Sequence, residues 1–151
     1  MSPAERMLIE HECGRLSISF AHLNDAREFA ELSGLFAPDG IFVRPLSASA
    51  PLVGPQAILG DLSAKPPTLL TRHLCMNVRV EVDSAEKARG TTSFLTLVQR
   101  NADPQRLPMP FTGEAYVGEY RDEFVLTPAG WRIARREGHI CFEMKSGLQH
   151  V

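Results

Sequence analysis

The spacing of apolar residues changes along the chain and predicts a helical first half and a β-rich second half. From Pro3 to Asn24, apolar residues recur at alternating steps of four and three, at positions 9, 13, 16, 20 and 23. This spacing is typical of one face of an amphipathic helix. From Leu69 onward the period becomes two, which indicates long, half-buried strands.

Two more helices are expected before the strands. Asp25-Ala-Arg-Glu28 has the spacing of a capping box, so Asp25 is predicted to cap a second helix. The buried stripe of that helix would comprise residues 29, 32, 35 and 36. Residues 38–40, Pro-Asp-Gly, are typical of a turn. Pro55 is predicted to begin a short third helix that ends before Pro66.

Four long strands are predicted in the second half, at residues 69–82, 88–100, 113–126 and 131–142. Residues 127–130 join the last two as a hairpin. Helices followed by hairpin-connected strands predict one α+β domain over residues 1–151 with a curved antiparallel sheet. The three helices are the cover available for its buried face. A strongly twisted sheet wrapped around helices leaves a conical cavity at one end.

Composition and charge narrow the classes of partner. Hydrophobic residues make up 44% of the chain, charged residues 23%, and the formal net charge is −2. Without a cluster of Lys and Arg, nucleic acid is excluded as a partner. No apolar stretch approaches the ~20 residues that cross a bilayer, and the N-terminus lacks a signal-peptide pattern, so we expect no membrane partner and a cytoplasmic location. Cysteine and histidine spacings predict no metal site, and we expect no cofactor.

Asp25 and His73 are the candidate catalytic residues, and the pattern alone leaves each with two interpretations. Asp25 is either a plain helix cap or a carboxylate at the rim of the pocket. His73 is either a hydrogen-bonded structural residue of its strand or a group that transfers protons near neutral pH. The second interpretation requires a neighbouring carboxylate. Periodicity does not show whether the two residues meet.

A series of motifs resembles the SnoaL-like proteins across nearly the whole chain. Residues 20–39, FAHLNDAREFAELSGLFAPD, resemble the opening helices of that family. Further motifs follow in the family's order at Gly54, 71–73 (TRH), 118–120 (GEY), 122–123 (DE) and 130–133 (GWRI). The resemblance implies the nuclear transport factor 2-like fold, also described as a cystatin-like roll. This is a cone of bent sheet closed by helices.

The resemblance also implies a role for the two candidates. The superfamily includes scytalone dehydratase, polyketide cyclases, steroid isomerase and the β subunits of ring-hydroxylating dioxygenases. In scytalone dehydratase, an Asp and a His at the places matching Asp25 and His73 form a hydrogen-bonded pair in the pocket. This chain keeps both residues but has Asn24 where that dehydratase has a Tyr. The resemblance therefore implies an Asp–His dyad without selecting one reaction.

Three functions follow as hypotheses. The first is a cofactor-independent lyase, isomerase or cyclase acting on a small apolar, aromatic or polyketide-like molecule. The others are a binding protein without catalysis and an accessory subunit resembling a dioxygenase β subunit. The residues expected to line the pocket are Phe20, Asn24, Phe42, Met76, Tyr116, Tyr120, Trp131 and His139, with core packing as the alternative for the Tyr and Trp residues. Arg136 is expected at a salt-bridged surface or interface, and a homodimer is expected to cover the outer face of the sheet.

Overall fold

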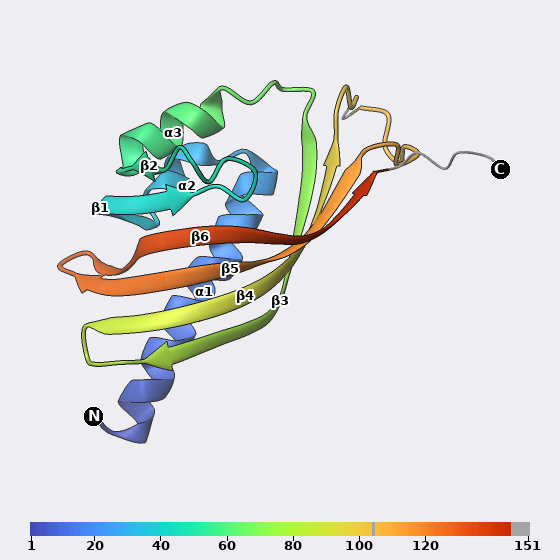
Figure 1. Cartoon of the computed structure of the whole chain (residues 1–151). Helices are drawn as coiled ribbons and strands as arrows, with labels where there is room; N and C mark the ends of the chain where they lie inside the picture. The colour runs from blue at the N-terminus through green and yellow to red at the C-terminus, as the bar shows by residue number, and fades with distance from the viewer. Residues whose placement is uncertain (104, 146–151) are drawn as a thin grey trace.

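The computed structural model describes residues 1–103 and 105–145, and its helices lie on one side of a bent sheet (Figure 1). The helices are α1 (Pro3–Ala26), α2 (Phe29–Ser33) and α3 (Pro55–Ser63). The strands are β1 (Phe36–Val43), β2 (Leu52–Val53), β3 (Leu70–Val82), β4 (Lys87–Gln99), β5 (Glu114–Thr127) and β6 (Gly130–Lys145). The predicted α+β class, with helices first and four long strands last, is confirmed. No helix in the described part of the chain is long and apolar enough to span a membrane.

The sheet is curved and remains open. Its strand order is β2-β1-β6-β5-β4-β3, and only the β1–β6 pair is parallel. α1 packs along β3, while α2 and α3 lie together beside β1. The long strands bend so that one end of each rises beside α3 (Figure 1).

The junction between the first two helices differs from its prediction. α1 begins with a capping box formed by Ser2 and Glu5 and continues through Asp25 to Ala26. The predicted capping box at Asp25 is therefore wrong, because Asp25 lies in the last turn of α1 and Glu28 is the cap of α2. α2 ends at Ser33, before the end of the predicted stripe. Residues 38–40 lie within β1, at an irregularity in its pairing with β6, rather than in a chain-reversing turn.

Aromatic rings fill the core between α1 and the sheet. The Phe20 ring centroid lies 5.3 Å from that of Phe42 and 5.9 Å from that of Tyr120, in edge-to-face arrangements. Tyr120 in turn lies 4.5 Å from Phe94. A Cβ at Gly118 would lie 2.5 Å from the Phe94 ring, so the glycine leaves room for that ring. Such packing contributes rigid apolar surface at the point where the sheet bends.

A bulge in β3 changes which side chains face inward. Its pairing with β4 shifts between Met76 and Arg79, and Asn77 has a positive φ of 50°. Before the bulge, His73 faces inward, while Met76 is 43% exposed on the outer face. After it, Val78 lies against Gly14 of α1. Leu74 and Met76 thus face outward while Val80 and Val82 pack in the core, because one extra residue reverses the alternation.

Candidate functional site

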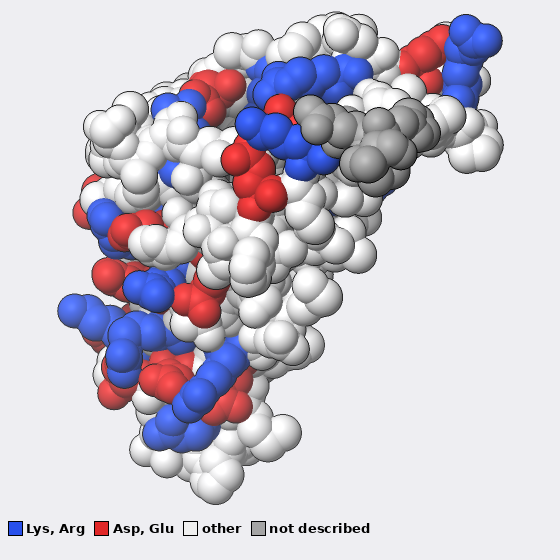
Figure 2. Space-filling model, turned by 45° about the vertical axis from the view of Figure 1, so that its right-hand side comes forward, with Lys and Arg blue, Asp and Glu red and all other residues white. Residues whose placement is uncertain are grey.

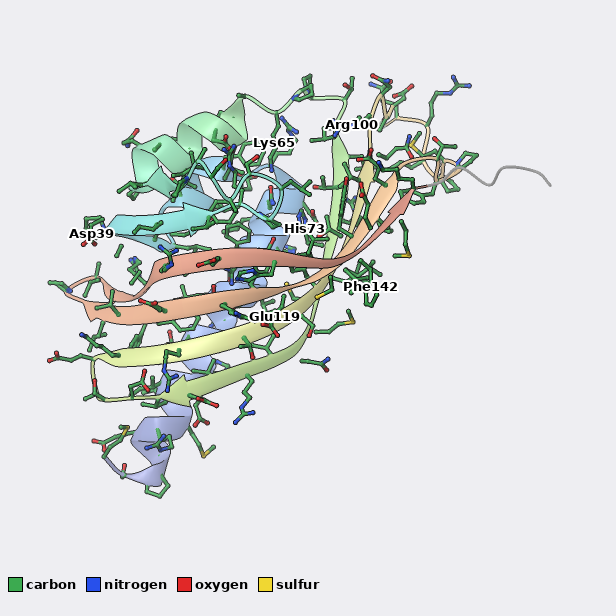
Figure 3. The ribbon with its side chains drawn as sticks, in the orientation of Figure 1. Asp39, Lys65, His73, Arg100, Glu119 and Phe142 are labelled. Carbon is green, nitrogen blue, oxygen red and sulfur yellow. The ribbon has the colours of Figure 1, made fainter. Side chains whose placement is uncertain are left out.

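A cavity of about 240 Å³ opens where the strand ends meet α1, α3 and β1. Its wall combines apolar and polar side chains. Five of the predicted pocket residues lie on it, namely Phe20, Asn24, Phe42, Tyr116 and Tyr120. His73 also lies on the wall, close to the α1 end that carries Asn24 (Figure 3). The cavity is large enough for a small organic molecule.

The structure brings Asp25 and His73 into direct contact. Asp25 Oδ1 lies 2.6 Å from His73 Nδ1, and Oδ2 accepts the main-chain N–H of His73 at 2.7 Å. The Thr71 hydroxyl donates to Oδ1 at 3.0 Å. The side chains of His73 and Asp25 are only 9% and 16% exposed. One carboxylate thus ties the end of α1 to the first residues of β3 and orients the imidazole.

The electrostatics of Asp25 favour a fixed tautomer of His73. Burial raises the pKa of Asp25, but the hydrogen bonds and charge of His73, together with the Thr71 hydroxyl, outweigh it and lower the pKa overall. Asp25 is therefore ionised at neutral pH and only accepts hydrogen bonds. A neutral His73 must then carry its proton on Nδ1, which leaves Nε2 with a lone pair that can accept a hydrogen bond or a proton.

Asn24 and Lys65 continue this network into the cavity. Asn24 Nδ2 lies 3.5 Å from His73 Nε2, and Lys65 Nζ donates to Asn24 Oδ1 at 3.0 Å. Because an ammonium only donates, the amide oxygen must face Lys65 and the amide nitrogen must face His73. Asn24 was predicted as a wall residue, but nothing in the sequence pattern indicated Lys65.

Three predicted pocket residues lie elsewhere. Met76 is on the outer face of β3, because the bulge after it reverses the alternation of the strand. Trp131 packs against the core next to the β5–β6 hairpin. His139 lies 3.4 Å from Glu137 with its side chain 41% exposed. An uninterrupted alternation would put His139 on the same face as Trp131, but bulges in β6 break this alternation.

The expectation that Arg136 lies at a surface or interface is wrong. Its side chain is fully buried and makes two hydrogen bonds of 2.7 Å to Asp122, which also accepts from the Ser17 hydroxyl at 2.8 Å. The guanidinium lies 4.5 Å from the Phe20 ring centroid and 4.6 Å from that of Tyr120. Burial lowers the pKa of Arg136, but Asp122 outweighs it and raises the pKa overall. A charged pair therefore supports two aromatic residues of the cavity wall.

Among residues 1–103 and 105–145, no group of three or more His, Cys, Asp or Glu side chains is arranged to hold a metal ion.

Comparison with known proteins identifies the fold. A model of the SnoaL-like domain matches residues 5–137. A proposed scytalone dehydratase from Novosphingobium aromaticivorans is 17% identical, with a TM-score of 0.81 over 98% of this chain and 94% of that one. A type 2 hexachlorocyclohexane dehydrochlorinase, LinA, is 17% identical, with a TM-score of 0.82 over 99% and 97%.

A third solved structure has the same architecture. It is a protein of the nuclear transport factor 2-like class with a cystatin-like fold from N. aromaticivorans, 22% identical over 90% of this chain and 84% of that one, with a TM-score of 0.68. The predicted nuclear transport factor 2-like fold is therefore confirmed. A search of curated proteins found no match.

Proposed function

The chain belongs to the SnoaL-like family, and from this premise we propose that it binds a small, mostly apolar molecule in the cavity and transfers a proton through His73. The observation that carries the proposal is the 2.6 Å contact of Asp25 with His73, a residue on the wall of the cavity.

The chemistry follows from the tautomer of His73. Nε2 takes a proton from a carbon next to a carbonyl or a leaving group, and the Asp25 carboxylate stabilises the imidazolium that forms. The electron pair left on carbon then expels a leaving group, shifts a double bond or closes a ring. Apolar walls such as Phe20, Phe42 and Phe94 exclude water and strengthen the electrostatic interaction.

The relatives support elimination as the reaction class. A scytalone dehydratase and a hexachlorocyclohexane dehydrochlorinase are each named for the removal of a small molecule from their substrates, and both share this fold over nearly their whole length. We therefore place a lyase ahead of an isomerase or cyclase.

Replacement of His73 by Gln is expected to abolish the proton transfer. The measurement is hydrogen–deuterium exchange at the α-carbon of enolisable aromatic ketones, headed by 2-tetralone, followed by NMR in heavy water. The wild-type protein should accelerate exchange over buffer, and His73→Gln should lose about 100-fold or more of that acceleration. His22→Gln, which alters an exposed histidine on α1, is the matched control and should exchange as the wild type does. Equal rates in the wild type and His73→Gln would contradict the proposal.

A binding protein without catalysis is the second candidate. Asp25 also accepts the main-chain N–H of His73 and the Thr71 hydroxyl, so the dyad has a structural role whether or not it reacts. Ketones that raise the melting temperature without exchanging or being converted would favour this candidate.

We also propose that a second copy of the chain covers the outer face of the sheet. A row of apolar side chains crosses four paired strands there, comprising Leu74, Leu95, Val117 and Phe142. Leu74 is 46% and Phe142 66% exposed. Charges of both signs flank the row, including the Glu119–Arg121 pair. A two-fold contact sets such a patch against itself, so apolar rows meet and opposite charges can pair.

Phe142→Glu is expected to convert this dimer to a monomer, because it puts a charge on a member of the apolar row that is 66% exposed. Light scattering coupled to gel filtration at micromolar concentration measures the change. Met7→Glu is the control, since Met7 is similarly exposed, at 68%, but lies on α1. A wild-type protein that is already monomeric would overturn the proposed dimer.

A further inference from the structure

Lys65 is a cation of the cavity that has no acidic partner. It follows α3, lines the cavity, and its Nζ makes one hydrogen bond, to Asn24 Oδ1 at 3.0 Å. None of the ion pairs among residues 1–103 and 105–145 includes it. Its ammonium also lies 5.8 Å from the centroid of the Phe29 ring. An ammonium has three N–H donors, so two have no hydrogen-bond partner among the described residues and can bind a ligand.

Most of the charged side chains on the rest of the cavity wall are basic. Arg44, Lys65 and Arg100 line it, and Asp61 is the one carboxylate among the lining residues that the structure describes. Asp61 is already paired with Arg44. Arg100 lies 3.8 Å from Glu114 and is 67% exposed. Figure 2 shows basic side chains at this upper end of the molecule, with acidic ones among them. Among the described residues, no carboxylate forms an ion pair with Lys65, so its charge remains available to a ligand in the cavity.

The environment of Lys65 favours an anion. Burial lowers the pKa of Lys65, and the opposite effect of the Asp61 carboxylate is smaller. A negative oxygen beside Nζ would offset this loss of hydration, and the apolar walls would strengthen the attraction. Lys65 Nζ and His73 Nε2 contact the two ends of the Asn24 amide, and both residues line the cavity (Figure 3). One small molecule beside this amide can therefore contact both groups.

We propose that Lys65 binds a negatively charged oxygen of the molecule held in the cavity, so that the ligand is a small apolar compound with an oxyanion. The oxyanion has two sources: a carboxylate present before reaction, or the enolate oxygen formed when His73 removes a proton. The inference rests on the proposed function in placing the ligand in this cavity, but it concerns binding and does not require the proton transfer.

Benzoate and its neutral isostere benzamide test the site by isothermal titration calorimetry. The wild-type protein should bind benzoate at least about tenfold more tightly, as expected for one charge-assisted hydrogen bond. Lys65→Met keeps the apolar stem and should lose this preference. Lys65→Gln keeps a donor for Asn24 and should lose it as well. Lys87→Met, which removes an exposed lysine of β4, should retain it.

A second arm identifies the source of the oxyanion. If the source is an enolate, Lys65→Met lowers kcat for 2-tetralone exchange about tenfold or more and leaves KM unchanged. This result is expected whether or not the variant also loses its preference for benzoate over benzamide. If the source is a carboxylate, the loss is confined to the Kd for benzoate. His73→Gln should keep the benzoate preference, which separates failure of this site from failure of the proposed proton transfer. Lysine variants that match the wild type in both arms would overturn the inference.

Discussion

Replacing Asp122 by Ala is expected to lower the free energy of unfolding by about 3–5 kcal/mol, because it leaves the fully buried Arg136 guanidinium without its anion. For a chain of this size, the melting temperature should fall by roughly 6–20 °C. Urea unfolding followed by circular dichroism measures the first quantity and calorimetry the second. The loss would also loosen Phe20 and Tyr120, whose rings the guanidinium contacts.

Two variants give this prediction its controls. Asp39→Ala removes an exposed carboxylate and should change the free energy of unfolding by no more than about 0.5 kcal/mol. The double variant Asp122→Leu/Arg136→Met replaces both charges by apolar groups and should be more stable than Asp122→Ala. An Asp122→Ala protein as stable as Asp39→Ala would show that the pair contributes nothing.

Asp25→Asn is expected to lower the rate of ketone exchange by about 10²- to 10⁴-fold. An amide can present its NH₂ group to His73 Nδ1, which favours the tautomer protonated on Nε2. In that tautomer Nε2 has no lone pair to accept a proton. The exchange rate at saturating ketone is the quantity to measure. A variant that keeps the wild-type rate would show that Asp25 has only a structural role.

The pH dependence of stability tests the structural role of Asp25 separately from its role in proton transfer. Its pKa in the folded protein is lowered below the ordinary value of 3.8, so the folded state binds its proton less readily than the unfolded state. The stability that the carboxylate contributes is fully present above pH 3.8 and is lost as the pH falls through the lowered pKa. The difference in unfolding free energy between wild type and Asp25→Asn should therefore narrow below pH 3.8. A constant difference would contradict this assignment.

Sequence pattern predicted the elements that bury one face each. The stripe at positions 9, 13, 16 and 20 places α1 on the sheet because burial of those side chains is what stabilises a long helix. Strands β3 to β6 follow from alternation and the hairpin residues. Asp25 was assigned to a cap because its spacing to Glu28 fits one. The tertiary contact with His73 requires a strand that begins 45 residues later.

The sequence did not predict which side chains of β3 and β6 face inward near the bulges, or where Arg136 and Lys65 lie. One added residue at Asn77 in β3, and similar bulges in β6, reverse the inward side without leaving a clear signal in the hydrophobic period. Met76 and His139 were placed on the wrong face for this reason, and Arg136 was placed outside. Lys65 follows a short helix whose packing, not its own sequence, turns it toward the cavity.

The most direct test of the dyad is the ¹⁵N NMR spectrum of the His73 imidazole in the wild-type protein at neutral pH. We expect Nδ1 to have the chemical shift of a protonated nitrogen and Nε2 that of an unprotonated one, because Asp25 accepts from Nδ1 at 2.6 Å. In Asp25→Asn the two shifts should move toward the opposite tautomer. A wild-type spectrum with the proton on Nε2 would contradict the proposal that His73 is a base poised toward the cavity.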